Sequence, residues 1–542
     1  MDHQGDKAKI ELTLPNTFPD QLPCIRLLDS DKAIPRAHIE RNGVICIAPS
    51  TGILLDTARP HRIIAEVLER ARKVIFNTDP KWQLTELQRE FTAYWPDDLA
   101  THSICAIPKD AGEIAAIEVR PKRHSARKWQ LFGKDRRTVE AWTSRIGWMA
   151  GQDLKPAFLI VFNSLFEPPR FSRKVNLRDF MSLIRSHVSS DSWSAFDAWL
   201  NANRLPVDLL MAAPSSQGEG SVVFGARLWS AREVVPGFRP GKCPSRMQMH
   251  SAANTPINRL AVERLDAEFL IQRGGGRPEL LPQKAMLLGC GAVGSHVAVG
   301  LAAAGIGTLC LVDKEQLSSE NVHRHVLGMK HVGVNKAEGL AEYIAGRFPH
   351  VVIEPDQRDI LTILSQPRGI PDGCNLVVVA LGDETLERRV NMTLGLTVRR
   401  VHVWLEPLGL GGHVLVTGFP EVQGCYECLY KEDGDHGLVN MAGLSAPGQT
   451  FHRSMEGCAG TYSPYGCVDA EQAAVEAVRA AIAVLLGEVA TPYLQSWVVS
   501  KRGILAAGGQ LSRRGESLSI GCSTTEEGFG QAGCTVCGGG RL

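Results

Sequence analysis

Residues 284–336 read KAMLLGCGAVGSHVAVGLAAAGIGTLCLVDKEQLSSENVHRHVLGMKHVGVNK, and this stretch decides the fold of the C-terminal half. A short apolar run at Ala285–Leu288 leads into a glycine-rich turn and an apolar helix pattern, and a second apolar run follows at Thr308–Val312. The turn has the spacing G-x-G-x-x-G, with glycines at Gly289, Gly291 and Gly294. This order of strand, glycine turn, helix and strand predicts a nucleotide-binding βαβ unit within an α/β fold.

Each glycine of the turn has its own expected role. Gly289 allows the tight turn, Gly291 leaves room for a phosphate, and Gly294 lets the helix pack on the sheet. The helix N-terminus then offers free N–H groups to an anion. Asp313 ends the second strand about 20 residues after the glycines, where an acid can bind ribose hydroxyls.

The residues after Asp313 favour ATP over a nicotinamide cofactor. The sequence continues as D-x7-N-x2-R-x11-K, through Asn321, Arg324 and Lys336, and Asp383 follows the apolar strand Leu376–Leu381. Two cations and an amide suit a triphosphate, whose charge must be compensated during attack on its α-phosphorus. A carboxylate at the end of a strand suits Mg2+.

This set resembles the nucleotide site of the ThiF-type adenylyltransferases, which include the ubiquitin-activating enzymes. The resemblance covers roughly residues 255–542 and implies a Rossmann-like adenylation domain that uses ATP and Mg2+. In that family the equivalents of five residues bind ATP and magnesium: Asp313, Asn321, Arg324, Lys336 and Asp383. The alternatives are a nicotinamide-binding domain and a degenerate nucleotide fold without activity.

Two C-x-x-C pairs predict a structural zinc site. They are Cys425 with Cys428 and Cys534 with Cys537. Four thiolates in two such pairs form a tetrahedral Zn2+ site, and the long gap requires the C-terminal tail to fold back onto the domain. ThiF-type proteins carry a paired knuckle of this kind. The alternative is a set of redox-active or free thiols.

The segment between the knuckles holds a candidate nucleophile. Cys458 lies in a glycine-rich stretch shortly before an alanine-rich helix predicted at Asp469–Leu486. In ThiF-type enzymes a cysteine at this place, in the crossing loop, attacks the adenylated carbonyl. A thiolate near a helix start has a lowered pKa. Cys467 is the competing candidate, and an inert buried cysteine is the remaining alternative.

The N-terminus predicts a second, α+β domain over residues 1–95. Strands are expected at Lys9–Leu14 and Cys24–Leu28, and Asn42-Gly43 signals a turn before Cys46. Apolar residues at helical spacing predict a helix that begins at Pro60.

This arrangement resembles the ubiquitin-conjugating fold, with its NG-x-x-C motif. The resemblance implies that Cys46 carries a thioester. Where the family has His-Pro-Asn, this chain has Arg36-Ala37-His38, so His38 can orient or activate, but the usual asparagine is missing. The family's first helix is also missing from the pattern.

Residues 100–250 are predicted to form an α/β connector without a glycine loop. Strand-like runs alternate with helical stretches such as Ser190–Ala202. We interpret the connector as a nucleotide-free relative of the adenylation domain. Lys and Arg total 59 and Asp and Glu total 58, so no global charge bias points to nucleic acid or membrane. No apolar stretch reaches the roughly 18 residues of a membrane span, and the 14 cysteines suit a reducing cytoplasm.

The order of the domains resembles that of bacterial fused conjugating–activating enzymes, the ligase-like proteins of CBASS antiphage systems. The resemblance implies that a protein C-terminus is adenylated, captured by Cys458, passed to Cys46 and transferred to a lysine amine. The activated partner would be a cyclic-oligonucleotide synthase or a ubiquitin-like protein, and the enzyme would be a homodimer. The alternatives are a sulfur-carrier adenylyltransferase, in which Cys458 carries a persulfide, and a non-catalytic scaffold that binds a C-terminus.

Overall fold

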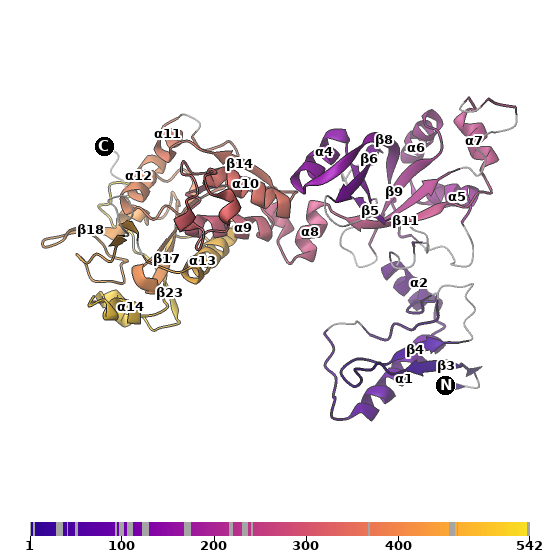
Figure 1. Cartoon of the computed structure of the whole chain (residues 1–542), viewed down its shortest axis with the longest axis horizontal. Helices are drawn as coiled ribbons and strands as arrows, with labels where there is room; N and C mark the ends of the chain where they lie inside the picture. Colours follow the sequence, from indigo (N-terminus) through magenta and orange to yellow (C-terminus); the bar gives the residue numbers. More distant parts are fainter. Residues whose placement is uncertain are drawn as a thin grey trace. The chain divides into compact units, whose positions relative to one another are not determined.

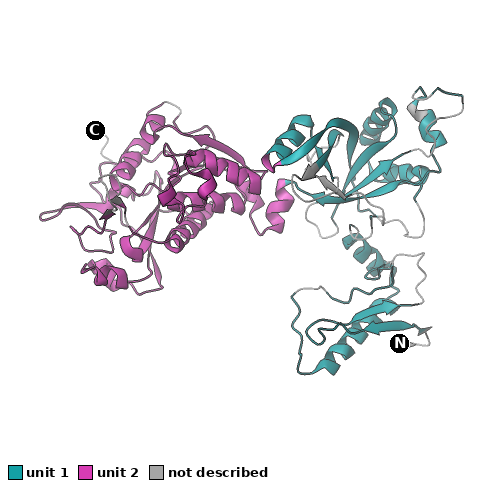
Figure 2. Cartoon of the chain, in the orientation of Figure 1, with its two compact units in different colours: residues 1–144, 148–266 teal, residues 145–147, 267–542 magenta. Residues whose placement is uncertain are grey.

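The computed structural model of the chain contains two compact units, which Figure 2 distinguishes by colour. Unit 1 comprises residues 1–144 and 148–266, and unit 2 comprises residues 145–147 and 267–542. The predicted boundary inside unit 1, at residues 95–100, remains a prediction. The structure describes residues 2–3, 6–28, 36–40, 42–48, 52–90, 92, 95–96, 102–105, 112–121, 129–166, 175–215, 221–229, 237–239, 242–366, 369–454, 461–462 and 464–538.

Unit 2 is built on one eight-stranded sheet (Figure 1). The first five strands in spatial order are parallel, and the last three are antiparallel to their neighbours. This order confirms the Rossmann-like prediction. The strands in spatial order are β14 (Val352–Asp356), β13 (Thr308–Val312), β12 (Lys284–Leu288), β15 (Leu376–Val379), β16 (Arg399–Leu405), β17 (Gly411–Thr417), β22 (Tyr493–Val498) and β23 (Ser523–Glu527).

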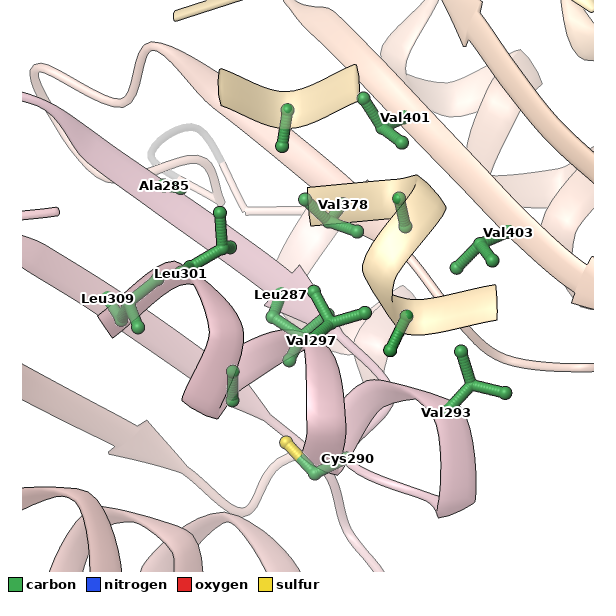
Figure 3. Close-up of a cluster of buried hydrophobic side chains, with 14 of the residues drawn as sticks. Ala285, Leu287, Cys290, Val293, Val297, Leu301, Leu309, Val378, Val401 and Val403 are labelled. Carbon is green, nitrogen blue, oxygen red and sulfur yellow. The ribbon is translucent and has the colours of Figure 1, made fainter. Parts of the chain in front are cut away.

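Helices cover both faces of this sheet because its parallel strands are apolar on both sides. Side chains of β12 alternate: Ala285 and Leu287 join one buried cluster, shown in Figure 3, and Met286 and Leu288 join another. The first cluster is completed by α9 (Ala292–Ala304), α10 (Lys336–Arg347) and α13 (Cys467–Leu485), and the second by α11 (Ile360–Leu364) and α12 (Glu384–Leu394).

The helix predicted at Asp469–Leu486 is present as α13 and begins two residues earlier, at Cys467. Its alanine face is buried against α9 and the sheet within the same unit. The close approach needs Gly300 of α9, because a Cβ there would lie 2.8 Å from a methyl group of Val478. The alanine face of α13 is thus buried by contacts within one chain and is not available for a dimer interface.

The middle of unit 1 is a closed barrel of mixed parallel and antiparallel strands. This closed barrel differs from the open sheet of unit 2, which has a parallel core of five strands, so it gives no support to the interpretation of this region as a relative of the adenylation domain. Its strands in spatial order are β10 (Ser221–Leu228), β11 (Asn258–Arg264), β5 (His102–Cys105), β7 (Trp129–Gly133), β6 (Gly112–Pro121), β8 (Trp148–Val161) and β9 (Val207–Pro214).

Helices pack on this barrel as its outer layer. Aromatic and aliphatic residues of two of them join the strands in one buried cluster. The predicted helix at Ser190–Ala202 is confirmed, and the sequence signal is strong there because Ser189 caps it. The helices are α4 (Arg136–Arg145), α5 (Leu177–His187) and α6 (Ser190–Ala202).

The N-terminal part of unit 1 pairs a hairpin with two helices. Strands β3 (Ile10–Thr13) and β4 (Cys24–Leu27) pair in antiparallel fashion, and α1 (Pro60–Phe76) begins at the predicted proline. A second helix, α2 (Pro80–Arg89), follows after three residues. Apolar residues of β4 and α1 share one core with Ile39 and Ile45. In the described part of the chain, no helix has the length and hydropathy needed to cross a membrane.

Candidate functional site

The glycine turn lies at the carboxyl edge of the parallel sheet, between β12 and α9. Gly289 has φ +92°, and a Cβ there would lie 2.6 Å from the carbonyl oxygen of Ala380. A Cβ on Gly294 would overlap the carbonyl oxygen of Gly289. Around Gly291, by contrast, nothing lies within 4 Å of a Cβ position. Gly289 and Gly294 are therefore required by packing, whereas Gly291 leaves open space at the N-terminus of α9.

Asp313 is buried at the end of β13, beside this turn. Its carboxylate accepts hydrogen bonds from the backbone N–H groups of Cys290 and Glu315, each at 2.8 Å. Burial raises the pKa of Asp313, and these two N–H groups oppose that shift. Because β13 and β12 are neighbours, the acid and the glycine turn share one edge of the sheet.

Lys336 and Arg324, the two cations that the sequence assigns to the nucleotide, both lie in unit 2. Lys336 begins α10, is 6% exposed, and pairs with Glu315 at 2.6 Å. The Arg324 guanidinium lies 4.7 Å from the ring centre of Tyr465. Asn321 accepts a hydrogen bond from the Ser318 hydroxyl at 3.1 Å, so its side chain has a local structural role in this structure.

Asp383 follows β15, which is the other neighbour of β12. Its carboxylate caps α12 by accepting a hydrogen bond from the backbone N–H of Leu386 at 3.0 Å. Asp383 is exposed. The first parallel neighbours of β12 thus carry the two acids that the sequence assigns to nucleotide and metal.

Two buried residues form hydrogen bonds with the turns that follow β15 and β12. The sequence did not indicate either of them. The Glu387 carboxylate accepts from the N–H groups of Leu381 and Gly382 at 3.3 and 3.1 Å, and burial raises its pKa to about 8. His325 Nε2 lies 2.8 Å from the carbonyl oxygen of Cys290. Burial lowers the pKa of His325 to about 4, so the ring is neutral at pH 7.

The tautomer of His325 follows from its two contacts. Its Nδ1 accepts from the N–H of Leu327 at 3.0 Å, so the proton is on Nε2 and the ring donates to Cys290. The ring therefore holds the carbonyl group of Cys290, whose N–H is held by Asp313. The sequence offers only its place beside Arg324 as a signal.

The four knuckle cysteines come together in unit 2. Their sulfur atoms lie within 4.8 Å of one another, with pairs at 3.9, 3.6 and 3.3 Å. Tetrahedral Zn2+ with ligands at about 2.3 Å sets sulfur–sulfur distances near 3.8 Å, so the four side chains fit the metal. A hydrogen bond with Cys425 lowers the pKa of Cys428. Asn391 donates to Cys425 at 3.6 Å and orients it.

Cys458, the first candidate nucleophile, lies outside the described residues. The competing candidate, Cys467, is the first residue of α13 and is partly exposed. Its sulfur lies 4.0 Å from His296 Nε2 on α9 and 3.4 Å from the Glu471 carboxylate. Burial and Glu471 raise the pKa of the Cys467 thiol. His296 follows Gly294 by two residues, so this thiol lies close to the start of α9.

Cys46 and His38 lie close together in the N-terminal part of unit 1. Cys46 is exposed, and its backbone N–H donates to the carbonyl oxygen of His38 at 2.7 Å. One ring nitrogen of His38, the Cys46 sulfur and a carboxylate oxygen of Glu90 all lie within 4.8 Å of one another. Glu90 and its neighbour Glu86, at the end of α2, were missed from the sequence.

Comparison with protein families assigns both ends of the chain. Residues 268–498 match the ThiF family, and residues 1–102 match prokaryotic E2 family B. The chain carries a ThiF domain behind an E2-like domain.

One relative of the ThiF domain is named for two activities. The adenylyltransferase and sulfurtransferase UBA4 of Saccharomyces cerevisiae is 28% identical over 190 residues, which is 33% of this chain and 41% of that protein. The chain thus spans less than half the length of this relative.

A relative from Pseudomonas aeruginosa aligns with most of the chain. Its ATP-dependent ubiquitin transferase-like protein Cap2 is 26% identical over 454 residues, which is 79% of this chain and 77% of that protein. Among solved structures, E. coli MccB with MccA-N7isoASN aligns with 50% of this chain and 70% of its own, at 18% identity and a TM-score of 0.35.

Proposed function

We propose that this chain activates a protein C-terminus with ATP in its ThiF domain and conjugates it to an amine through Cys46 of its E2-like domain. The observation that supports this most directly is the presence, in one chain, of an acid-flanked glycine turn and an exposed Cys–His site. The Cap2 similarity extends over most of the chain and supports the same order of events. By the same resemblance, we place the activity in CBASS antiphage defence and in the cytoplasm, where thiols stay reduced.

Adenylation would take place at the carboxyl edge of the ThiF sheet. Asp313 would bind the ribose, the N-terminus of α9 at Gly291 would receive phosphates, and Lys336 and Arg324 would compensate their charge. Asp383 would hold Mg2+, which supplies charge compensation to the phosphates when it is bound. The roles of these residues, and of Asn321 as a phosphate ligand, follow the family resemblance.

Capture and transfer would use two thiols in sequence. Cys458 is the proposed first nucleophile, and Cys467 with its neighbour His296 is the alternative within the described residues. The first thiol attacks the acyl-adenylate, which releases AMP, and Cys46 then takes over the acyl group by thioester exchange. An amine of the acceptor finally attacks the Cys46 thioester, which gives an amide.

The four knuckle cysteines would hold Zn2+ as a structural ion. Cys534 and Cys537 come from the C-terminal tail, so the ion would link that tail to the segment that carries Cys425 and Cys428. We also expect a homodimer of the ThiF domain. The exposed residues Val468 and Val475 of α13 remain available to a partner, although its alanine face does not.

An assay of ATP–pyrophosphate exchange tests adenylation. The proteins encoded by genes that flank this one are purified and added one at a time, with a C-terminally truncated form of each as the control. We expect exchange with one intact protein and none with its truncated form, together with a dithiothreitol-sensitive adduct on non-reducing gels. If ATP-dependent adducts instead carry a persulfide by mass spectrometry, the chain is a sulfur-carrier adenylyltransferase. Absence of exchange and adducts with every flanking protein contradicts the proposal.

A further inference from the structure

The Cys46 site contains two carboxylates that the family resemblance does not account for. Glu86 and Glu90 both come from the end of α2 and contact opposite sides of the His38 ring. Glu90 lies 2.9 Å from Nδ1, and Glu86 lies 3.3 Å from Nε2. Helical spacing of four residues puts both acids on one face of the helix end.

Helix α2 is fixed to the segment that carries His38. Gln83 accepts a hydrogen bond from the N–H of Ala37 at 2.9 Å, and its amide donates to the carbonyl oxygen of Asn77 at 2.8 Å. Ala37 and Leu87 are buried together, and Trp82 packs against them. These contacts hold the two acids at a defined place beside the ring.

Helix stability does not explain this arrangement of charges. Like charges four residues apart repel each other, and an acid at the C-terminus of a helix faces the negative end of its dipole. Glu90 is the residue that follows the last turn of α2. Arg89 offsets part of this negative charge by pairing with Glu86 at 3.2 Å. A positive imidazolium at His38 offsets the charge beside Glu90, and the hydrogen bond with Glu90 raises the pKa of His38.

The backbone also directs His38 toward the thiol. His38 has φ +62°, a left-handed conformation that is costly for a residue with a side chain and is concentrated at functional sites. The carbonyl oxygen of His38 receives the N–H of Cys46, so the conformation that places the ring also fixes the position of the cysteine.

We propose that Glu90 is a positioning residue that holds His38 as the proton donor to the Cys46 sulfur when the acyl group leaves for the acceptor amine. This inference rests on the proposed function and adds a residue and a role to it. Glu86 supports the same ring from its other nitrogen.

All protons transferred in this step are exchanged among His38, the Cys46 sulfur and the attacking amine. The amine nitrogen attacks the thioester carbonyl carbon, the C–N bond forms and the C–S bond breaks. The electron pair of that bond goes to the Cys46 sulfur, which takes the proton of the His38 imidazolium. The neutral imidazole then accepts the proton that the attacking nitrogen loses, so an amide and a thiol are formed and His38 is again charged.

A proton donor is needed here because the leaving thiolate is poorly stabilised. Burial, Glu90 and Glu40 raise the pKa of the Cys46 thiol. A sulfur that resists ionisation leaves more readily when it is protonated during bond breaking. Glu90 acts on both groups, because it disfavours the Cys46 thiolate and favours the His38 imidazolium.

The test uses the full-length chain and a chemical thioester, so that it is independent of ATP. An acetyl-Gly-Gly thioester of mercaptoethanesulfonate is exchanged onto Cys46, and loss of the acyl group to O-methylhydroxylamine is followed by mass spectrometry of the Cys46 peptide. This acceptor is a weakly basic amine that stays unprotonated, so the pH profile reports on the enzyme. The titratable and charged groups around His38 include Glu86, Glu90 and Cys46, with Glu40 beside Cys46 and Arg89 paired with Glu86.

Four variants define the result. Glu90→Gln should slow the discharge roughly tenfold or more, and the rate should fall at a lower pH than in the wild type, because His38 loses its proton earlier. Glu90→Asp should restore part of the rate. His38→Gln should slow the discharge about 100-fold and remove this limb of the profile. Thr85→Ala, an exposed change on the same helix, should leave the rate unchanged.

The outcomes separate this inference from the proposed function. A folded Glu90→Gln chain with the wild-type rate and the wild-type pH limb overturns the role of Glu90. If Glu90→Gln and Glu90→Asp fail to fold, the His38 pKa in the wild type, followed by NMR, decides: a value at or below that of an unperturbed histidine overturns the proposal. If the discharge depends on Glu90 but ATP never loads the chain, adenylation fails and the role of Glu90 stands.

Discussion

The carboxylate of Asp313 accepts a hydrogen bond from the backbone N–H of Cys290 at 2.8 Å. This bond joins the end of β13 to the middle of the glycine turn after β12, and the second oxygen accepts from the N–H of Glu315. Asp313 therefore builds the edge at which a nucleotide is expected to bind, in addition to any contact it makes with that nucleotide.

Substitution of Asp313 by Asn tests the structural role of its carboxylate. The amide keeps one acceptor but turns an N–H donor toward another N–H, so we expect a loss of about 1–3 kcal/mol in the free energy of unfolding of the ThiF domain, measured by urea denaturation. Asp359→Asn is the matched control, because both of its backbone hydrogen bonds use one oxygen that the amide retains. Equal stability of the two variants would argue against a structural role of Asp313.

Asp383 allows a test of the metal site that leaves its helix intact. Its carboxylate caps α12 through Leu386, and Asn is as good a cap as Asp. We therefore expect Asp383→Asn to fold normally yet to lose at least about 100-fold in ATP–pyrophosphate exchange, because the metal loses a charged ligand. Asp383→Ala should lose the cap as well, at a cost of about 1 kcal/mol. Retained exchange in the Asn variant would reject Asp383 as a metal ligand.

The zinc prediction has a direct readout. The chain should contain one zinc ion per protomer by elemental analysis, and Cys534→Ser should lower both zinc content and melting temperature, because a structural ion contributes folding energy outright. Cys522→Ser is the control, since Cys522 is an exposed cysteine outside the cluster. Purified chain that remains folded and active without zinc would contradict the prediction.

The His38 ion pairs should appear in the pH dependence of stability. Because Glu90 and Glu86 raise the pKa of His38 in the folded chain, their stabilisation is fully present below the pKa of an unfolded histidine, about 6.5. It is lost as the pH rises through the folded value. Urea denaturation at a series of pH values should therefore show a decline for the wild type that is flatter in His38→Gln. Identical slopes would indicate that the ring is neutral between the two acids.

Local patterns predicted those parts of the sites whose residues are close in sequence. The glycine turn, Asp313, the hairpin before Cys46 and the helix at Pro60 all follow from spacing and turn residues. The contacts of His38 with Glu86 and Glu90 join segments about 50 residues apart, and no periodicity encodes that meeting. The barrel is a similar case, because its closure depends on parallel pairing of β5 with β11, far apart in the chain.

The same limit applies to the thiols. The family resemblance placed Cys458 ahead of Cys467, and the sequence reveals neither the neighbour His296 from α9 nor Glu471 one turn further along α13. A packed pair of helices brings those groups together.

The relay of thiols gives the most discriminating prediction. A first thiol must capture the acyl-adenylate before Cys46 can receive the acyl group, since each exchange needs an activated donor. Cys458→Ala should thus retain ATP–pyrophosphate exchange, which needs no thiol, but form no thioester. Cys46→Ala should accumulate a dithiothreitol-sensitive adduct on the ThiF domain and give no amide. Cys467→Ala should behave as the wild type.

Non-reducing gels of each variant with ATP and the activated protein, with peptide mapping of every adduct, check this order. If Cys467→Ala rather than Cys458→Ala loses the first thioester, Cys467 is the capture thiol, and His296→Gln should then slow capture roughly 100-fold because its base is removed. If Cys46→Ala still yields the full amount of amide, the E2-like domain only docks the acceptor. In that case the first thioester discharges directly to the amine, and the E2-like cysteine has no part in the chemistry.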